Sequence, residues 1–424
     1  MAAVEHRERR DEASAAPITC VGVGWGAVAR IHEAATRRLG VRTVGVVEID
    51  RDRHQAIRMA GLRPFATIDE AAALAPTFWD VRTPLRAHID SLARIHALCP
   101  DADVVVEKPV CQYADIDDLQ SVLADHRGRV VVNENYCSSA VTRGIAAHVA
   151  RLGLRPTKVV VEMTKHRGRD FLGGRFLDPT LGAFGYEGTH LLAAVAALGP
   201  EYLRGTIFDL DVDNLPMVDS HGSPLNNSEH DLESHPEIVL LARQGGAFVG
   251  YRTDAGCRVE LYTSLSGIIG YPCPPFAPAA AVIDQHDTAR RYRIFRVDGT
   301  APDGAPHRVV GFYEPMPGHE RGQAAIALFR DWALTELISP IPDDTMTRHF
   351  RRIIDHFTGN GDNPCPPELG VTSVRQLHDW AQQGSVEHGS DSDHVLGADR
   401  TVTERAWEAA QFRLHNRSGT NVER

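Results

Sequence analysis

The stretch ITCVGVGWGAVARIH, residues 18–32, has the pattern of a buried strand that runs through a glycine turn into a helix. Gly24, Gly26 and Ala29 have the spacing of the three small residues in a dinucleotide-binding turn. The first glycine makes the bend, the second lets a pyrophosphate approach the backbone, and the small third residue lets the helix pack closely. The start of the helix would then attract the phosphate charge. The stretch therefore predicts the first strand and helix of a nucleotide-binding sheet.

An acidic residue is expected at the end of the second strand of such a unit, where it binds the ribose hydroxyls. Glu48 has this position in the stretch GVVEIDRDR and favours NAD, because a carboxylate repels the 2′-phosphate of NADP. Arg51 and Arg53 follow closely, so NADP is not excluded. Trp25 and Val28 lie within the glycine turn and its helix start, and we expect both to contact the cofactor. The alternative is that the glycines serve only a tight turn.

Apolar strands and helical stretches alternate from residue 17 to about residue 136, which predicts a parallel sheet covered on both faces. Later strands follow one another directly, which predicts an open, mostly antiparallel sheet. Helical periodicity is expected to return in GQAAIALFRDWALTEL, residues 322–337, and in the helices after it. The expected fold class is α/β, with a doubly wound Rossmann domain followed by an α/β C-terminal domain. The expected divisions are a disordered leader over 1–16, the dinucleotide-binding domain over 17–137, a substrate and oligomerisation domain with C-terminal helices over 138–385, and a polar tail with a short helix over 386–424.

The chain has 424 residues, a net charge of −11 and seven cysteines. The negative charge argues against nucleic acid or an anionic membrane as the main partner. No segment reaches the ~18 to 20 apolar residues that span a bilayer, and the charged start of the chain lacks the apolar region of a secretory signal. The cysteines are scattered and odd in number, which favours reduced thiols. We therefore expect a cytoplasmic protein whose partner is a small molecule.

Two further motifs stand at the ends of expected parallel strands, where the ligand crevice of a doubly wound sheet lies. In DVRTPLRAH, residues 80–88, Thr83 and Pro84 start a helix, and helix capping alone would account for them. In DVVVEKPV, residues 103–110, a buried run of valines ends at Lys108. A partly desolvated lysine near a nicotinamide is suited to hydrogen-bond a reacting hydroxyl and to help move its proton. The alternative is a surface lysine in a turn.

Three short motifs occur in a characteristic order and spacing. They are GxGxxA over 24–29, TPxxxH over 83–88 and EKP over 107–109. Together they resemble the motifs of the glucose–fructose oxidoreductase/inositol dehydrogenase (Gfo/Idh/MocA) family, of which EKP is the most specific. The resemblance is close from residue 17 to about residue 140 and continues as a weaker pattern to about residue 340.

The resemblance implies an NAD(P)-dependent oxidoreductase. Such an enzyme moves a hydride between nicotinamide and a secondary alcohol or ketone of a sugar or cyclitol, including sugars that bear a nucleotide or phosphate. It has an active site between its nucleotide-binding domain and a domain with an open sheet. A homodimer or homotetramer that assembles through this sheet is the common arrangement in the family.

The resemblance also assigns roles to residues. Lys108 would be the catalytic lysine, contacting the nicotinamide ribose and the substrate hydroxyl. Glu107 and Pro109 would shape a turn in which the Lys–Pro bond is often cis. Further contacts to the cofactor would come from the second motif, and the next strand would line the substrate pocket. These residues are Thr83, Pro84 and His88 for the cofactor, and Asn133, Asn135 and Tyr136 for the pocket.

The family's second signature is an aspartate four residues before a histidine, on a helix that opens in the second domain. The matching stretch GAFGYEGTH, residues 182–190, has His190 but carries Tyr186 at the aspartate position, followed by Glu187. Residues three and four apart share a helix face. Two roles stay open: Tyr186 donates the proton itself, or His190 is the acid/base and Glu187 orients it. We favour His190 as the proton-transfer residue, with Lys108 assisting.

The stretch MTKHRGRDFLGGRF, residues 163–176, is unusually basic for an acidic protein. Lys165 and Arg167 are expected to bind a carboxylate or phosphate of the substrate, although a solvated loop or a subunit interface would have the same composition. HGSDSDH, residues 388–394, has metal-ligand residue types without an element to fix them, so we expect a solvated loop and no metal site. Two alternative functions remain open, an imine reductase on a carboxylate-bearing substrate and a non-catalytic regulatory protein that binds a nucleotide.

Overall fold

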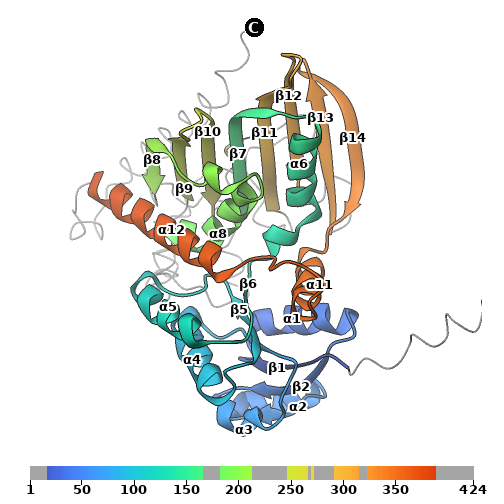
Figure 1. The fold of residues 1–424 in the computed structure, drawn as a ribbon, viewed down its shortest axis with the longest axis vertical. Helices are drawn as coiled ribbons and strands as arrows, with labels where there is room; N and C mark the ends of the chain where they lie inside the picture. Colours follow the sequence, from blue (N-terminus) through green and yellow to red (C-terminus); the bar gives the residue numbers. More distant parts are fainter. Residues whose placement is uncertain are drawn as a thin grey trace, which may run out of the picture. The chain divides into compact units, whose positions relative to one another are not determined.

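The computed structural model describes residues 17–165, 182–212, 246–265, 269–271, 291–314 and 322–387 (Figure 1). The chain divides into two compact units. Unit 1 comprises the residues up to Asn133 together with His349–Val371, and unit 2 comprises Glu134–Arg348 and the residues from Thr372 onward. The expected leader over 1–16 lies outside the described residues, as does the expected tail beyond residue 387.

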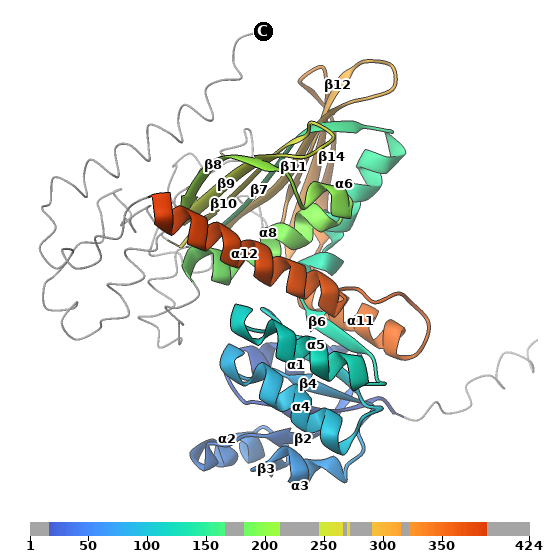
Figure 2. The ribbon, with the colours of Figure 1, turned by 60° about the vertical axis from the view of Figure 1, so that its left-hand side comes forward.

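Unit 1 is built around a parallel six-stranded sheet in the order β3-β2-β1-β4-β5-β6. Its elements are β1 (Thr19–Val23), α1 (Ala27–Arg38), β2 (Arg42–Val47), η1 (Arg51–Arg53), α2 (His54–Met59), β3 (Pro64–Phe65), α3 (Ile68–Ala72), β4 (Phe78–Val81), η2 (Leu85–Ala87), α4 (His88–Leu98), β5 (Asp103–Glu107), η3 (Tyr113–Asp115), α5 (Ile116–Asp125) and β6 (Val130–Asn133). Every residue of β4, β5 and β6 is buried, as expected for parallel strands covered on both faces. Helices α4 and α5 lie side by side along one side of this sheet (Figure 2). The predicted doubly wound sheet is confirmed.

The strand order reverses direction between β1 and β4, where ligands bind in doubly wound sheets. The carboxyl ends of β1, β4 and β5 lead into the three motifs identified in the sequence. Register supports this alignment, because Val23 pairs with Val81 and Val81 pairs with Val106. The topology therefore brings the starts of all three motifs to one edge of the sheet.

The outer edge of β6 is covered by the segment His349–Val371, which contains the end of α11 (Thr345–Phe357) and the start of α12 (Pro367–Glu387). The backbone N–H of Val132 donates to the carbonyl of Cys365 at 2.9 Å. The side chain of His349 lies 3.1 Å from the carbonyl oxygen of Val132, and Asn363 donates to the carbonyl of Val130 at 2.9 Å. A segment distant in the sequence thus satisfies the polar backbone groups of an edge strand.

Unit 2 is built around an eight-stranded sheet in the order β14-β13-β12-β11-β7-β10-β9-β8. Its elements are η4 (Asn135–Ser138), α6 (Ala140–Arg151), β7 (Arg155–Lys165), α8 (Gly182–Ala196), η6 (Pro200–Tyr202), β8 (Thr206–Val212), β9 (Gly246–Arg252), β10 (Arg258–Ser264), β11 (Arg291–Thr300), β12 (Pro306–Phe312), β13 (Gln323–Arg330) and β14 (Ala333–Pro342), with the start of α11 and most of α12. Within the described sheet β7 and β10 run parallel, and all other neighbouring strands are antiparallel. The predicted open, mostly antiparallel sheet is confirmed.

Two helices cover the central strands of this sheet (Figure 1). Helix α6 packs against β11, β12 and β13, and α8 packs against β7, β9 and β10. The approach of α6 is close because β12 has Gly311 at the contact, where an added Cβ would lie 2.2 Å from Cγ1 of Val141. Helix α8 is apolar along much of its length, as its burial between the sheet and α12 requires: Gly188 lies against Leu377 and Phe184 against Trp380.

The predicted helix over 322–337 is wrong. The chain forms the hairpin of β13 and β14 there, and the turn residues Asp331 and Trp332 have φ of +50° and +65°. Two successive positive φ angles are the mark of a tight hairpin turn whose twist matches that of its strands. The run of apolar residues in β13 is buried on both faces, so it lacks the alternation that would have indicated a strand.

None of the six cysteines within the described residues forms a disulfide. No helix in this part of the chain combines the length and the apolar character needed to cross a membrane.

We predict that Gly311→Ala lowers the free energy of unfolding by about 1–3 kcal/mol, because the new methyl group overpacks the contact with Val141. Urea unfolding followed by circular dichroism measures the loss. Adding Val141→Ala removes the opposing methyl groups, so the double variant should lose less stability than the two single variants together. Additive losses would contradict this packing.

Candidate active site

The glycine turn of unit 1 has the geometry that a bound pyrophosphate needs. Gly24 has φ of +99°, and a Cβ there would lie 2.9 Å from the carbonyl oxygen of Arg82. Gly26 precedes α1, and a Cβ there would meet no atom within 4 Å. Having no side chain, Gly26 leaves the first amides of α1 to be satisfied from outside the helix. Ala29 is fully buried, which fits the close packing expected of the third small residue.

Glu48 fixes this turn from the end of β2. Its carboxylate accepts hydrogen bonds from the backbone N–H of Trp25 at 2.9 Å and of Asp50 at 3.0 Å. The ring of Trp25 packs in a buried cluster with Ala29 and Ile57, so Trp25 contributes its backbone N–H to the turn and its side chain to the core. Each carboxylate oxygen has two lone pairs, so Glu48 can also accept a hydrogen bond from a ribose hydroxyl.

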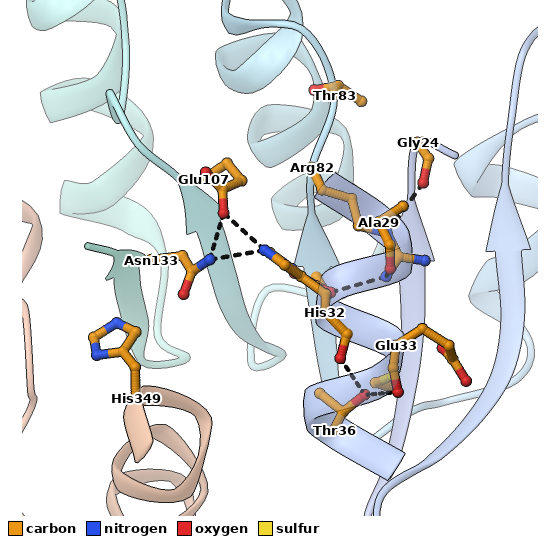
Figure 3. A network of polar contacts seen from close by, with 12 residues as sticks. Gly24, Ala29, His32, Glu33, Thr36, Arg82, Thr83, Glu107, Asn133 and His349 are labelled. Atoms are coloured by element: carbon orange, nitrogen blue, oxygen red, sulfur yellow. Dashed lines mark hydrogen bonds and ion pairs between the residues drawn. The ribbon is translucent and has the colours of Figure 1, made fainter. Parts of the chain in front are cut away.

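Arg82 is a residue of the site that sequence reasoning missed. Its Nε donates to the carbonyl of Gly24 at 3.0 Å, and its Nη1 donates to the carbonyl of Ala29 at 3.3 Å and to Asp80 at 3.2 Å (Figure 3). Gly22 makes room for it, because a Cβ there would lie 2.0 Å from Nη2. The sequence did contain a signal for this role: Arg82 follows a buried strand and lies two residues after Asp80, so the two side chains share one strand face.

His32 on α1 joins two of the neighbouring strands. Its Nδ1 lies 3.0 Å from Oδ1 of Asp80 and its Nε2 lies 2.8 Å from Oε1 of Glu107, which also accepts a hydrogen bond from Asn133 (Figure 3). Burial lowers the pKa of His32, but the charges and hydrogen bonds of Asp80 and Glu107 outweigh it and raise the pKa to about 9. The imidazole therefore carries a positive charge at neutral pH.

The two carboxyl groups respond in the opposite sense. Burial raises the pKa of Glu107, but its contacts with His32, Asn133 and Lys108 more than compensate and lower it. Burial acts on the pKa of Asp80 in the same way and is outweighed by His32 and Arg82. Both groups are therefore ionised, and the buried cluster has balanced charges.

Lys108 follows Glu107 at the end of β5, and its backbone N–H donates to Oε2 of Glu107 at 3.2 Å. The peptide bond between Lys108 and Pro109 is cis, as the resemblance implied. His88 connects this turn to the second motif, since its ring nitrogens each lie 3.0 Å from a carbonyl oxygen, one of Pro109 and one of Thr83. Burial lowers the pKa of His88, so the neutral ring donates to one of these carbonyls at a time. His88 is thus placed between two turns of the site.

Other residues expected at the cofactor have different surroundings. Val28 is half-buried on α1, Thr83 is half-buried, and Pro84 is exposed. Arg53, which left NADP open in the sequence, forms an ion pair with Asp50 at 3.2 Å.

In unit 2 a second cluster gathers around His190 on α8. Its Nδ1 lies 2.6 Å from Oε1 of Glu134, and its ring lies 4.5 Å, centroid to centroid, from the ring of Tyr136. Glu187, which sequence reasoning suggested as the residue that orients His190, instead pairs with Arg293 at 2.8 Å. Glu134 lies in the loop after β6, so only the tertiary structure shows that it reaches this histidine.

Arg293 also donates a hydrogen bond to the hydroxyl of Tyr136. Burial raises the pKa of Tyr136 to about 12 although Arg293 acts against it, so this phenol is neutral. Tyr186 is half-buried on α8, at the position where the resembled family has its aspartate. The side chain of Asn135, which was expected to line the substrate pocket, donates a hydrogen bond to Thr345 at the start of α11, at 2.8 Å.

Two further basic residues lie near the carboxyl end of β7. Lys165 is buried there and pairs across the sheet with Arg291 of β11, two residues before Arg293. Alternation places all three cations on the same face of the sheet, the face that α8 covers. Arg291 and Arg293 lie 3.7 Å and 3.9 Å from Glu314, so part of this charge is balanced. Arg167 lies outside the described residues, as does the stretch 388–394.

No family model matches the sequence, and a search of curated proteins finds no match. Solved structures do match. An oxidoreductase from Agrobacterium radiobacter in complex with NAD+, L-tartaric acid and magnesium has 12% identity and a TM-score of 0.60, over 87% of this chain and 96% of that one. A putative NADPH-dependent oxidoreductase from Desulfitobacterium hafniense has 12% identity and a TM-score of 0.61, over 88% and 100%. The WlbA dehydrogenase from Bordetella pertussis, in complex with NADH and UDP-GlcNAcA, has 13% identity and a TM-score of 0.56, over 87% and 98%. At these identities the likeness shows a common fold.

We predict that the stability of the protein depends on the charge of His32. Its pKa in the folded state, about 9, lies above the ordinary value of 6.5. The stabilisation is therefore fully present below pH 6.5 and is lost as the pH rises through about 9. The free energy of unfolding of wild type minus that of His32→Gln should contain a pH-dependent part on the order of 3 kcal/mol.

Urea unfolding of both proteins at a series of pH values between 6 and 10 measures this difference. His356→Gln is the control, because it removes a half-buried histidine of the same unit whose ring faces the carbonyl of Gly361 and does not belong to the His32 cluster. A difference between wild type and His32→Gln that stays constant over this range would contradict the assigned charge.

Proposed function

We propose that this protein is an NAD-dependent oxidoreductase acting on a secondary alcohol or ketone of a sugar or cyclitol. The observation that carries the proposal is the alignment of the Gly24 turn and Lys108 at one edge of a doubly wound sheet, at the reversal of its strand order. Buried polar groups hold both of these features in place. Arg82 hydrogen-bonds the Gly24 turn, and Glu107 accepts a hydrogen bond from the backbone of Lys108. The oxidoreductases that share the fold support the same reading.

The proposed cofactor is NAD. The first amides of α1 behind Gly26 would bind the pyrophosphate, and Glu48 would accept a hydrogen bond from the adenosine ribose. The buried carboxylate of Glu48 disfavours the additional phosphate of NADP at this point. Arg53 offers little compensation, because Asp50 at 3.2 Å and Glu48 at 4.0 Å already share its charge.

When bound, NAD would supply the hydride acceptor for oxidation of the carbinol carbon, and the residues of this chain would handle the hydroxyl. Lys108 hydrogen-bonds the substrate hydroxyl and stabilises the negative charge that develops on its oxygen. His190 takes the hydroxyl proton through Nε2, because Nδ1 faces Glu134. Reduction of the ketone reverses each of these transfers.

The proposed substrate carries a carboxylate or a phosphate. The support is the pair of basic side chains at the carboxyl end of β7, Lys165 and Arg291, which share one face of the sheet. Arg293 on the same face already pairs with Glu187. An acidic substrate also fits an imine reductase, which a panel of keto acids with ammonia would reveal. Cofactor binding without turnover of any substrate would favour the regulatory alternative, to which the tyrosine at position 186 gives some weight.

A homodimer or homotetramer through the open sheet of unit 2 remains part of the proposal. Its support within the described residues is the apolar exposure of Trp332, Leu334 and Leu337 at the β13–β14 hairpin, where an edge strand would otherwise face water.

We predict that Glu48→Gln narrows the preference for NAD over NADP by about tenfold, because it removes the charge that repels the 2′-phosphate. Isothermal titration with each cofactor measures the two dissociation constants. Glu33→Gln is the matched control, since Glu33 is a buried glutamate of the same unit that bonds Thr43 and Arg37. A wild type that binds NADP more tightly than NAD would overturn the choice of cofactor.

We predict that Lys108→Met lowers kcat by about 10²- to 10⁴-fold while the dissociation constant for NAD stays within about threefold. Reduced-nicotinamide absorbance with a panel of acidic sugars and cyclitols measures turnover. Lys158→Met, which removes a lysine paired with Glu260 on the sheet of unit 2, serves as the control. Near-normal turnover by the Lys108 variant would remove this lysine from the mechanism.

A further inference from the structure

The histidine proposed for proton transfer lacks the aspartate that the resembled family places four residues before it. Tyr186 has that position in this chain, and a phenol is a weaker partner for an imidazolium than a carboxylate is. A histidine that acts through one ring nitrogen needs an acceptor on the other, which sets its tautomer and orientation. The chain must therefore supply that acceptor from elsewhere if His190 has the proposed role.

We propose that Glu134 is the positioning residue of His190: its carboxylate fixes the imidazole with Nδ1–H directed at Oε1 and stabilises the protonated ring. The catalytic role of this pair rests on the proposed function, whereas the contact between Glu134 and His190 is present in the folded protein without substrate or cofactor. Glu134 comes from the loop that follows β6, whereas the family's aspartate belongs to the helix of the histidine. The carboxylate has thus moved to a different element.

The geometry of the pair is close and enclosed. The two atoms lie 2.6 Å apart, and Glu134 and His190 are only 4% and 8% exposed. Glu134 is itself restrained, because Oε1 also lies 3.3 Å from the backbone nitrogen of Tyr136 in the turn that Glu134 caps. A short, water-shielded contact between a carboxylate and an imidazole is among the stronger hydrogen bonds in proteins.

The ring of Tyr136 restrains the imidazole from a second direction. The two rings are tilted by 45° with their centroids 4.5 Å apart. Tyr136 is held in turn by the hydrogen bond from Arg293 and by the edge of Tyr313, whose ring lies 5.0 Å away. Rotation of the imidazole about its Cβ bond would therefore break the contact with Glu134 and disturb a packed aromatic cluster.

The other charged groups of the cluster largely balance one another. Arg293 pairs with Glu187, Tyr136 is neutral, and Tyr186 is a phenol on the same helix as His190. Among the residues that the structure describes, Glu134 is the carboxylate in direct contact with the imidazole. Replacing it by glutamine keeps an oxygen that accepts from Nδ1–H but removes the charge, whereas alanine removes both.

The pairing is tested in the full-length protein without cofactor or substrate. Long-range ¹H–¹⁵N spectra of the histidine side chains report tautomer and titration, with His190→Asn assigning the signal. In wild type the neutral ring should be the Nδ1–H tautomer. In Glu134→Gln the ring should keep that tautomer and lose its proton at a lower pH, and in Glu134→Ala the tautomer should become mixed. A wild-type ring in the Nε2–H form, or a titration that neither substitution moves, would overturn the proposal.

The catalytic consequence is read from the pH profile of alcohol oxidation, in which His190 acts as base. Glu134→Gln should lower kcat by about tenfold and move the half-maximal rate to lower pH, and Glu134→Ala should lower kcat by about 100-fold. Glu260→Gln is the control, because it alters a buried glutamate of unit 2 that pairs with Lys158 and should leave the profile in place. An unmoved profile in both Glu134 variants would overturn the positioning role.

The experiments distinguish a failure of the Glu134–His190 pairing from a failure of the proposed function. A wild-type Nδ1–H tautomer that responds to Glu134 substitution, in a protein that turns over no substrate, would support the pairing and reject the proposed function. Turnover together with a titration that is insensitive to Glu134 would keep the function and reject the pairing.

Discussion

A protonated imidazole between two carboxylates is the interaction on which unit 1 depends. His32 belongs to α1, Asp80 to β4 and Glu107 to β5, so one side chain connects the first helix to two strands beyond the topological switch point. Burying ions is costly unless they are paired and hydrogen-bonded. Arg82 supplies the second cation, and the two positive and two negative charges balance. Removing any one of them would leave an uncompensated buried charge.

The same cluster positions the groups that the proposed reaction uses. Arg82 is bonded to the carbonyl oxygens of Gly24 and Ala29, and Thr83 follows it directly. Glu107 accepts from the backbone of Lys108. The glycine turn, the second motif and the proposed catalytic lysine are therefore attached to one buried polar core. Unit 2 uses a comparable device, in which Arg293 between Glu187 and Tyr136 restrains the surroundings of His190.

Most of unit 1 could be predicted from the sequence because its signals are local. The buried valine runs of β5 and β6 and the small residues at 24, 26 and 29 follow rules that act over a few positions. His32, Asp80 and Arg82 were missed since a polar residue in an apolar stretch shows no partner until the strands are adjacent. Glu134 was missed for a similar reason, and β13 was mistaken for a helix because burial on both faces removes the periodicity of a strand.

The segment His349–Val371 has a consequence for how the protein is made. It completes the outer edge of β6, yet it is synthesised only after all of Glu134–Arg348. At ribosomal rates of about 5–20 residues per second, β6 waits roughly tens of seconds for its cover. During that interval the nascent sheet presents the unpaired backbone groups of Val130 and Val132, a surface to which other strands adhere. The strands of unit 1 are made before those of unit 2, yet their sheet is completed later, and a chain that ended before residue 349 would carry that open edge permanently.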